Sequence, residues 1–311
     1  MNKCRQSFND SRKAAAALPF TDSTKISSGC SLSPRERVRV RGNAILIITV
    51  CLCLSFFTQK LFSAESPWAR VIVIGASASG GFVISEPFGG TNTDKCKLHR
   101  YLDAAITVPH APIKNLGTSL FFLNPDGLAD QQIEAATNTH PTLVVAVDFL
   151  FWFCYGDGDS DAERTQHFET GLKQLERIPC PLIIGDIPDA SSATNTGIIS
   201  AAQVPSEAAR RAANERLRQW AKSRHVTVVP LAEFMREVKA NEAVNLHNGT
   251  LPAGKTRSLM QADGLHPTPR GAAVLSLGIL DALVKSQKKF HATDVDWDPK
   301  EVFQRGLKTA R

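Results

Sequence analysis

Residues 71–82 read VIVIGASASGGF, and this stretch decides the fold expected for the chain. Val71–Ile74 is a continuous run of β-branched residues, which is typical of a parallel strand covered on both faces. The small residues that follow predict a tight turn from this strand into a helix. Such a turn places Ser77 at the carboxyl edge of the sheet, where α/β proteins bind ligands. Taken alone, the segment is more typical of a turn that packs the backbone or cradles a phosphate, although it lacks the P-loop and GxGxxG patterns.

Apolar runs alternate with amphipathic stretches from about residue 66 onward, which indicates an α/β sheet with helices on both of its faces. Further strands are expected in part of Pro112–Leu123, over Leu143–Val147 running into Phe149–Phe153, at Leu182–Ile184 and at Val226–Val229. Helices are expected at about 95–106, 127–137, 160–176, 206–223, 230–240 and 268–286. Residues 241–262 and 287–311 are expected to be polar loops or tails, and 187–204 to form a functional rim or a mobile loop.

The charge of the chain is concentrated at its N-terminus. Residues 1–42 hold nine Lys/Arg and three Asp/Glu, which accounts for the whole net charge of +6. Residues 43–311 are therefore neutral, and nucleic-acid binding through a broad basic surface is disfavoured.

The N-terminal residues have the order of a secretory signal. Four arginines at 35, 37, 39 and 41 precede the apolar run Ala44–Phe57, and the small pair Ser63-Ala64 follows. We expect a basic leader over 1–42, a signal peptide or signal anchor over 43–64, a folded α/β domain over 66–290 and a tail over 291–311. The long leader suggests a mis-assigned start, with translation beginning near Val38 or Val40. Export is expected, with membrane attachment only if the signal is not cleaved.

The cysteine pattern predicts neither a disulfide framework nor a metal site. Four of the seven cysteines lie at or before the apolar run, which leaves Cys96, Cys154 and Cys180 in the main body. These three have no CxxC or Cys/His spacing of a zinc site, so we expect buried or half-buried thiols.

A second candidate site lies just before the last long helix, where residues 263–268 read DGLHPT. A carboxylate three residues before a histidine can accept the imidazole Nδ1–H, which fixes the tautomer and leaves Nε2 facing a hydroxyl. A solvated turn with a capping aspartate is an equally good interpretation of Asp263 and His266 alone. Combined with Ser77 after the first strand, the pair predicts convergence at one edge of the sheet.

At these residues the sequence resembles the GDSL/SGNH hydrolase family. Gly75-Ala76-Ser77 is similar to the family's first block, and Asp263–Pro267 is similar to its last block. The resemblance covers about residues 70–286. It implies a flavodoxin-like three-layer α/β/α sandwich with a mostly parallel sheet of about five strands, and ester hydrolysis without a metal or organic cofactor. Ser77 would be the nucleophile, His266 the general base and acid, and Asp263 its orienter.

The sequence departs from the family pattern at two places. Ala76 stands where the first block has an aspartate. The family's oxyanion hole uses the N–H of the nucleophile, a glycine N–H and an asparagine side chain, and Gly117 is the candidate glycine. The asparagine is missing from Leu143–Phe153, so we expect either a substitute group or slow turnover, since one oxyanion donor is worth about 10²–10³ in rate.

Three further residues are candidates for substrate binding. Asp148 interrupts an apolar run, and we expect it to bond backbone N–H groups, with a substrate hydroxyl as the alternative. Trp152 offers an indole N–H or a stacking face, but a core position is favoured. Asp186 follows the fourth strand and lines the rim or shapes a turn.

These observations predict an exported serine esterase that acts on a small-molecule or carbohydrate ester, with O-acetylated carbohydrate as one substrate class. The alternative is a catalytically impaired binding protein that keeps the fold without the activity. A third interpretation, an anion-binding protein that uses the turn at 75–81, would not need Asp263 and His266.

Overall fold

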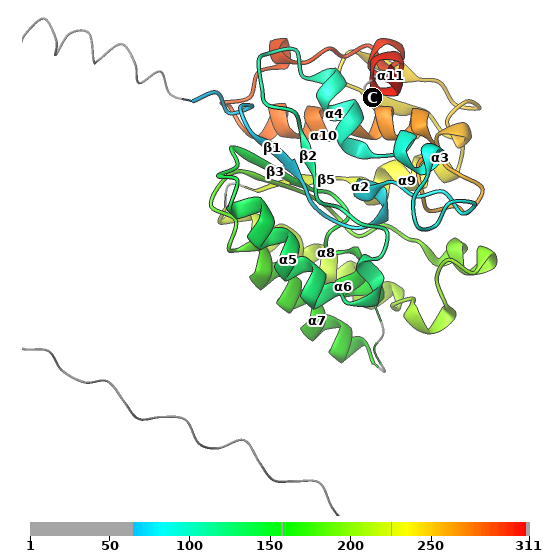
Figure 1. Ribbon diagram of the computed structural model, residues 1–311. Helices are drawn as coiled ribbons and strands as arrows, with labels where there is room; N and C mark the ends of the chain where they lie inside the picture. The colour runs from blue at the N-terminus through cyan, green and yellow to red at the C-terminus, as the bar shows by residue number, and fades with distance from the viewer. Residues whose placement is uncertain (1–64, 157, 159, 225, 309–311) are drawn as a thin grey trace, which may run out of the picture. The chain divides into compact units, whose positions relative to one another are not determined.

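The computed structural model describes residues 65–308 except 157, 159 and 225, and these residues form a central sheet with helices on both faces (Figure 1). The sheet has the order β2-β1-β3-β4-β5, and every neighbouring pair is parallel. Its strands are β1 (Val71–Val73), β2 (Lys114–Asn115), β3 (Leu143–Ala146), β4 (Leu182–Gly185) and β5 (Val226–Val229). The expected three-layer α/β/α architecture is confirmed, and each expected strand region contributes a strand.

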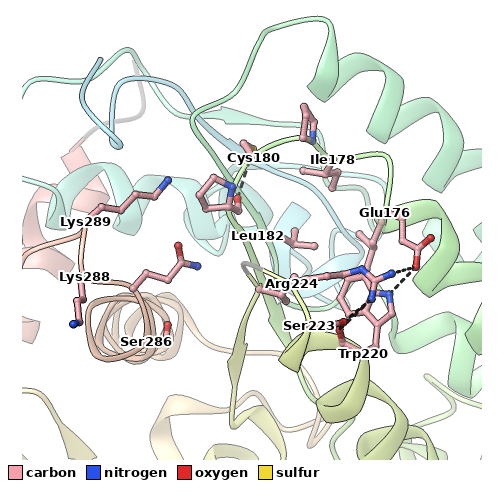
Figure 2. Close-up of a pocket in the computed structure, with 15 residues that line it drawn as sticks. Glu176, Ile178, Cys180, Leu182, Trp220, Ser223, Arg224, Ser286, Lys288 and Lys289 are labelled. Atoms are coloured by element: carbon pink, nitrogen blue, oxygen red, sulfur yellow. Dashed lines mark hydrogen bonds and ion pairs between the residues drawn. The ribbon is translucent and has the colours of Figure 1, made fainter. Parts of the chain in front are cut away.

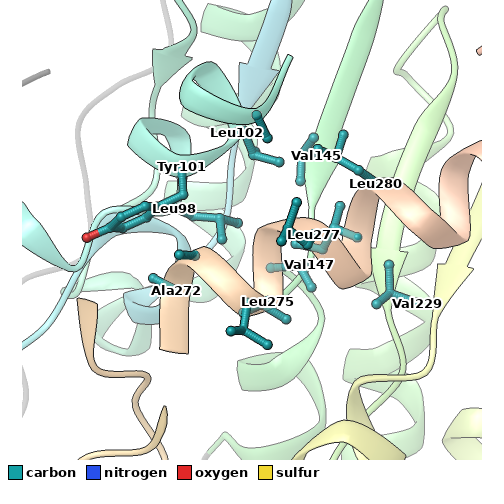
Figure 3. Packing of buried hydrophobic residues seen from close by; sticks show 14 of the residues in the cluster. Leu98, Tyr101, Leu102, Val145, Val147, Val229, Ala272, Leu275, Leu277 and Leu280 are labelled. Atoms are coloured by element: carbon teal, nitrogen blue, oxygen red, sulfur yellow. The ribbon is translucent and has the colours of Figure 1, made fainter. Parts of the chain in front are cut away.

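Alternate residues of the strands face opposite layers, as the two-residue period of a strand requires. Val71, Val73 and Val145 join one buried cluster, whereas Ile72 and Ile74 join the other. The first cluster is covered by α4 (Leu98–Ala105), α9 (Leu231–Lys239) and α10 (Pro269–Ser286), and its packing is seen in Figure 3. The second is covered by α5 (Pro125–Thr137), α7 (Asp161–Leu175) and α8 (Glu207–Lys222).

Polar side chains fix where several of these helices begin. The side chains of Asn124, Ser160, Ser206 and Thr268 accept hydrogen bonds from N–H groups in the first turns of α5, α7, α8 and α10. Each cap satisfies an N–H that has no partner within the helix. The start of α10 matters most for function, because the loop that ends at Thr268 carries Asp263 and His266.

Two expected segments differ from the structure. Phe149–Phe153 does not continue β3, because the chain forms the helix α6 (Phe151–Tyr155), in which the rings of Phe151 and Tyr155 stack at 4.4 Å. The expected tail at 291–311 is also wrong over its described part. It forms η5 (Ala292–Asp294) and α11 (Pro299–Lys308), and Val302 of α11 is fully buried against the first cluster.

The remaining elements are short and lie in the connections. They are α2 (Ser77–Gly80), α3 (Thr91–Lys95), η1 (Phe121–Leu123), η2 (Ser191–Thr196), η3 (Ala201–Gln203), η4 (Arg257–Leu259) and the antiparallel hairpin of β6 (Val244–Leu246) with β7 (Gly249–Leu251). The expected rim at 187–204 thus contains two 3₁₀ turns.

The leader and signal segment expected over residues 1–64 lie outside the described residues. Within the described part of the chain, none of the helices combines the length and apolar character needed to cross a membrane.

Candidate active site

The turn after β1 is shaped by a glycine that no other residue could replace without strain. Gly75 has φ +133°, and a Cβ at this position would overlap Oδ1 of Asp148. The buried amide of Gln132 holds Gly75 from the other side: its Oε1 accepts the Gly75 N–H at 2.7 Å, and its Nε2 donates to the Gly75 carbonyl at 3.0 Å. The backbone is therefore fixed two residues before Ser77, which is the first residue of α2.

Ser77, His266 and Asp263 form one chain of hydrogen bonds. The distance from Ser77 Oγ to His266 Nε2 is 2.8 Å, and that from His266 Nδ1 to Asp263 Oδ2 is also 2.8 Å. An ionised carboxylate only accepts hydrogen bonds, so the imidazole proton lies on Nδ1 and the Nε2 lone pair faces the hydroxyl. His266 and Asp263 are buried, whereas Ser77 is partly exposed. The structure thus brings Ser77 to Asp263 and His266, which lie 186 and 189 positions further along the chain.

The carboxylate of Asp263 is held in its charged form. Burial acts to raise its pKa, but the hydrogen bonds from His266, including its ring and backbone N–H, and from the backbone of Leu265 outweigh that effect and hold the pKa below the ordinary 3.8. Oδ1 accepts the N–H groups of Leu265 at 2.9 Å and His266 at 3.0 Å. Gly264, at φ +70°, lets the chain turn tightly enough for these contacts.

The loop that carries His266 is tied to the segment that follows the Ser77 turn. Gln261 Nε2 donates to the Phe82 carbonyl at 2.7 Å, and the Phe82 ring lies against the imidazole of His266 at 4.3 Å between centroids. These contacts limit the positions that the imidazole can take and shield one of its faces from water.

Asp148 holds the turn itself. Its carboxylate accepts the N–H groups of Ala76 at 3.1 Å, Ala78 at 2.7 Å and Ser79 at 3.2 Å, and the Ser79 hydroxyl at 2.6 Å. Burial raises the pKa of Asp148, and these hydrogen bonds act against that rise. The geometry therefore agrees with the backbone role rather than with the alternative of binding a substrate hydroxyl.

Gly117 lies against α2, as an oxyanion donor would have to. A Cβ at Gly117 would lie 3.0 Å from the Gly80 nitrogen and from Ser79 Cβ. However, its N–H already donates to Asn115 Oδ1 at 2.8 Å. The amide of Asn115 also donates to the Ser79 carbonyl at 2.9 Å and contacts His99 Nδ1 at 3.0 Å, so it joins this loop to α2.

Trp152 and Asp186 are not among the residues that line the cavity beside Ser77 and His266. Trp152 is 6% exposed and packs its indole against Phe151 and Phe122, with centroids 5.3 and 5.6 Å apart. Asp186 accepts the Ala232 N–H at 2.7 Å and so caps the first turn of α9. Burial raises its pKa, partly against the hydrogen bonds from that turn.

Sequence reasoning did not find Gln132, Asn115 or Gln261. Gln132 left a detectable signal, because it sits among Ala129, Ile133 and Ala136 on the apolar face of α5, where a buried amide needs partners. Asn115 ends the short polar strand β2 and Gln261 lies in a loop, and their contacts are with residues 36 and 179 positions away. No local pattern encodes such pairs.

Within residues 65–308, apart from the three undescribed positions, no group of three or more His, Cys, Asp or Glu side chains is arranged to hold a metal ion. Cys96 and Cys154 are buried and Cys180 is half-buried, all as free thiols. Burial raises the pKa of each above the ordinary 9.0, to about 11 or 12. These thiols are therefore poor nucleophiles.

A wider hollow lies elsewhere in the described part of the chain. It has a volume of about 680 Å³ and is lined by residues such as Cys180, Trp220, Arg224 and Lys289 (Figure 2). These residues precede β4 and β5 or follow α10, so the hollow lies at the amino edge of the sheet, opposite Ser77. Arg224 there is already bound to Glu176 at 2.5 Å. The chemistry of the chain is therefore to be sought at the smaller cavity beside Ser77.

No family model and no curated protein matches the sequence. Among solved structures, a GDSL-like lipase from Parabacteroides merdae is similar at 13% identity, with a TM-score of 0.44 over 70% of this chain and 97% of the other. A catalytic mutant of an acetylxylan esterase from Geobacillus stearothermophilus is similar at 14% identity, with a TM-score of 0.44 over 70% of this chain and 95% of the other. An acylhydrolase from Bacteroides fragilis is similar at 17% identity, with a TM-score of 0.42 over 75% of this chain and 96% of the other. These likenesses are distant, so the activity of this chain has to rest on its own residues.

Proposed function

We propose that the chain is a serine hydrolase that cleaves acyl esters with Ser77 as nucleophile. The observation that carries the proposal is the pair of hydrogen bonds that links Ser77 Oγ to the His266 imidazole and the imidazole to the Asp263 carboxylate, each 2.8 Å long. A serine, a histidine base and a buried carboxylate in this order form the minimum apparatus for nucleophilic catalysis at an ester carbonyl.

In the first step the Ser77 oxygen attacks the ester carbonyl carbon while His266 Nε2 takes the hydroxyl proton. The resulting imidazolium is stabilised by Asp263, whose depressed pKa keeps it charged. The tetrahedral intermediate then expels the alcohol, and His266 donates its proton to the leaving oxygen. In the second step His266 takes a proton from water while the water oxygen attacks the acyl carbon; the bond from this carbon to Ser77 Oγ then breaks, His266 returns the proton to Oγ, and the acid is released.

The negative oxygen of the intermediate needs N–H donors, and the contacts of the turn narrow the choice. Asp148 occupies the N–H groups of Ala76, Ala78 and Ser79, whereas the described residues offer no bonded acceptor to the Ser77 N–H. We therefore assign the first donor to Ser77. Gly117 is the second, and its N–H would exchange Asn115 for the oxyanion. Because the Gly117 N–H loses its hydrogen bond to Asn115 in this exchange, the net stabilisation of the oxyanion is reduced, which fits an enzyme of modest turnover rate.

The finer parts of the proposal concern the cellular location of the protein and the alcohol half of its ester substrate. Export rests on the basic and apolar order of residues 35–64, which lie outside the described residues. An O-acetylated carbohydrate is the substrate class that suits an exported enzyme with a neutral folded part. Neither depends on the site, so they are tested separately, by peptide mapping of the mature protein and by a screen of acetylated sugars.

The direct test is labelling with a fluorophosphonate, which reacts with a serine activated by a neighbouring base. We expect one adduct per chain, mapped by peptide mass spectrometry to Ser77 and lost in Ser77→Ala and His266→Ala. Ser85→Ala is the matched control, because it removes an exposed hydroxyl from the following loop without touching the site. An adduct on Ser79, or none at all, would overturn the proposal and favour the binding-protein alternative.

A further inference from the structure

A narrow apolar cavity of about 50 Å³ adjoins Ser77 and His266. Side chains of α9 and of the loop before α10 form most of its wall, among them Leu231, Met235 and Met260. Among the described residues that line it, the polar side chains are Ser77, His266 and Asp148. Because Asp148 uses its oxygens on the nucleophile turn, the remaining polar groups that face the cavity are the reacting ones.

The two halves of an ester place different demands on a site. The alcohol leaves after the first step and has to be replaced by water, so its path must open to solvent. The acyl group stays on Ser77 through both steps and gains from an apolar enclosure. A cavity with apolar walls that meets the nucleophile therefore fits the acyl half.

The volume limits what the cavity can hold. A water-sized group needs roughly 10–15 Å³ on this measure, and an apolar cavity of roughly 150 Å³ accepts benzene in another protein. About 50 Å³ thus has room for about three to five non-hydrogen atoms. Resting on the function proposed above, we propose that this cavity is the acyl site and that it restricts the enzyme to esters of short, unbranched acids, from acetyl to about butyryl.

The helix that forms the wall is held in place. The Asp186 carboxylate fixes the first turn of α9 through the Ala232 N–H at 2.7 Å. Leu231 and Met235 of this helix are each only 6% exposed. The wall therefore does not move aside easily for a longer acyl chain. Met235, as part of this wall, limits the length of the acyl group that the cavity accepts.

The experiment measures kcat/KM of the full chain on p-nitrophenyl acetate, butyrate, hexanoate and octanoate. We expect similar values for acetate and butyrate and a fall of about tenfold or more at hexanoate, since crowding by a methylene or two typically changes specificity by that factor. Met235→Ala should raise the hexanoate-to-acetate ratio about tenfold. Phe234→Ala enlarges the same cavity at a half-buried position and serves as a second variant should Met235→Ala fail to fold.

Leu280→Ala is the control for core truncation, because Leu280 is 1% exposed in α10 but does not line the cavity. It should leave the chain-length ratio unchanged. Octanoate cleaved as fast as acetate by the unmodified protein, or a ratio unmoved by both cavity variants, would overturn the acyl assignment. Failure of the proposed function is distinct, because then no ester is cleaved and the fluorophosphonate does not label Ser77.

Discussion

The hydroxyl of Ser79 donates to Oδ1 of Asp148 at 2.6 Å, so a carboxylate at the end of β3 is fixed beneath the turn that follows β1. The same carboxylate accepts N–H groups on both sides of Ser77. Ala76 stands where the GDSL/SGNH block has an aspartate. The turn of this chain therefore receives its carboxylate from the neighbouring strand, and the position of Ser77 depends on the β1–β3 pairing.

Replacement of this carboxylate should damage the turn. Asp148→Asn keeps one acceptor oxygen but turns an NH₂ group toward N–H donors, which leaves buried groups without partners. We expect the free energy of unfolding to fall by about 1–3 kcal/mol in urea titrations. We also expect slower labelling of Ser77 by fluorophosphonate.

Asp186→Asn provides the comparison, because the half-buried Asp186 also accepts a backbone N–H, but at α9 rather than at the turn around Ser77. It should lower stability while the rate of Ser77 labelling stays within about twofold. If both variants slowed labelling equally, Asp148 would have no special role in positioning Ser77.

The conformation of Gly75 makes a second prediction. In Gly75→Ala the added methyl group would overlap the Asp148 oxygen, and alanine rarely adopts the φ of +133° found here. We therefore expect the free energy of unfolding to fall by about 1–3 kcal/mol. Gly278→Ala in α10 has open space around the added Cβ and should gain about 0.5–1 kcal/mol. Thermal denaturation of the two variants should therefore shift in opposite directions, and a tolerated Gly75→Ala would contradict the geometry of the turn.

Asp263→Asn should affect rate and acid stability together. The amide can donate to His266 Nδ1 and so favour the wrong tautomer, and kcat should fall by about 10²–10⁴. The folded-state pKa of Asp263 lies below its ordinary 3.8. Its ionised form therefore stabilises the fold above about pH 4, and this contribution is lost as the pH falls through the lowered value.

Urea titrations between pH 6 and pH 3 measure this part of the prediction. The unmodified protein should lose stability toward the acid end more steeply than Asp263→Asn does. Equal slopes would mean that the carboxylate is not specifically stabilised by His266 and the loop.

Four of the five strands were predictable because they are short, mainly apolar runs bounded by turn residues, whereas β2 consists of Lys114 and Asn115. Val71–Ile74, for example, is too apolar for a strand with a solvated face, and a run of this kind identifies a parallel strand covered by two layers. The run Leu143–Phe153 could not be divided into a strand and a helix in the same way. Apolar residues at every position carry neither a period of two nor one of 3.6, so the end of β3 and the start of α6 left no mark in the sequence.

The site was predictable where its contacts are local. Asp263 and His266 are three residues apart, and their interaction follows from one tight turn. The contacts of Asp148 with Ala76–Ser79 and of Asn115 with Ser79 join different strands and loops, and they depend on the register of β1 with its two neighbours. The packing of α11 on α4 is likewise non-local, and its apolar residues are too few to distinguish a docked helix from a polar tail.

The last prediction concerns His99, which contacts the Asn115 amide at 3.0 Å. Burial, assisted by the charges of Lys97 and Arg100, lowers its pKa from 6.5 to about 4. The neutral ring accepts the amide N–H at Nδ1, whereas a protonated ring would present a second donor there. The folded state thus binds fewer protons than the unfolded one between these values. Its stability is complete above about pH 6.5 and falls by about 2 kcal/mol as the pH drops toward 4.

His99→Gln removes this titration and should flatten the dependence of the urea midpoint on pH between 6.5 and 4.5. His167→Gln is the control substitution and should leave the slope unchanged, because His167 is an exposed histidine on α7, which covers the opposite face of the sheet from α4. Since Asn115 also holds the Gly117 N–H, protonation of His99 loosens the loop beside α2, and Ser77 labelling in the unmodified protein should slow over the same pH range more than it does in His99→Gln. Identical pH profiles for the two proteins would show that His99 is not the group that couples this loop to pH.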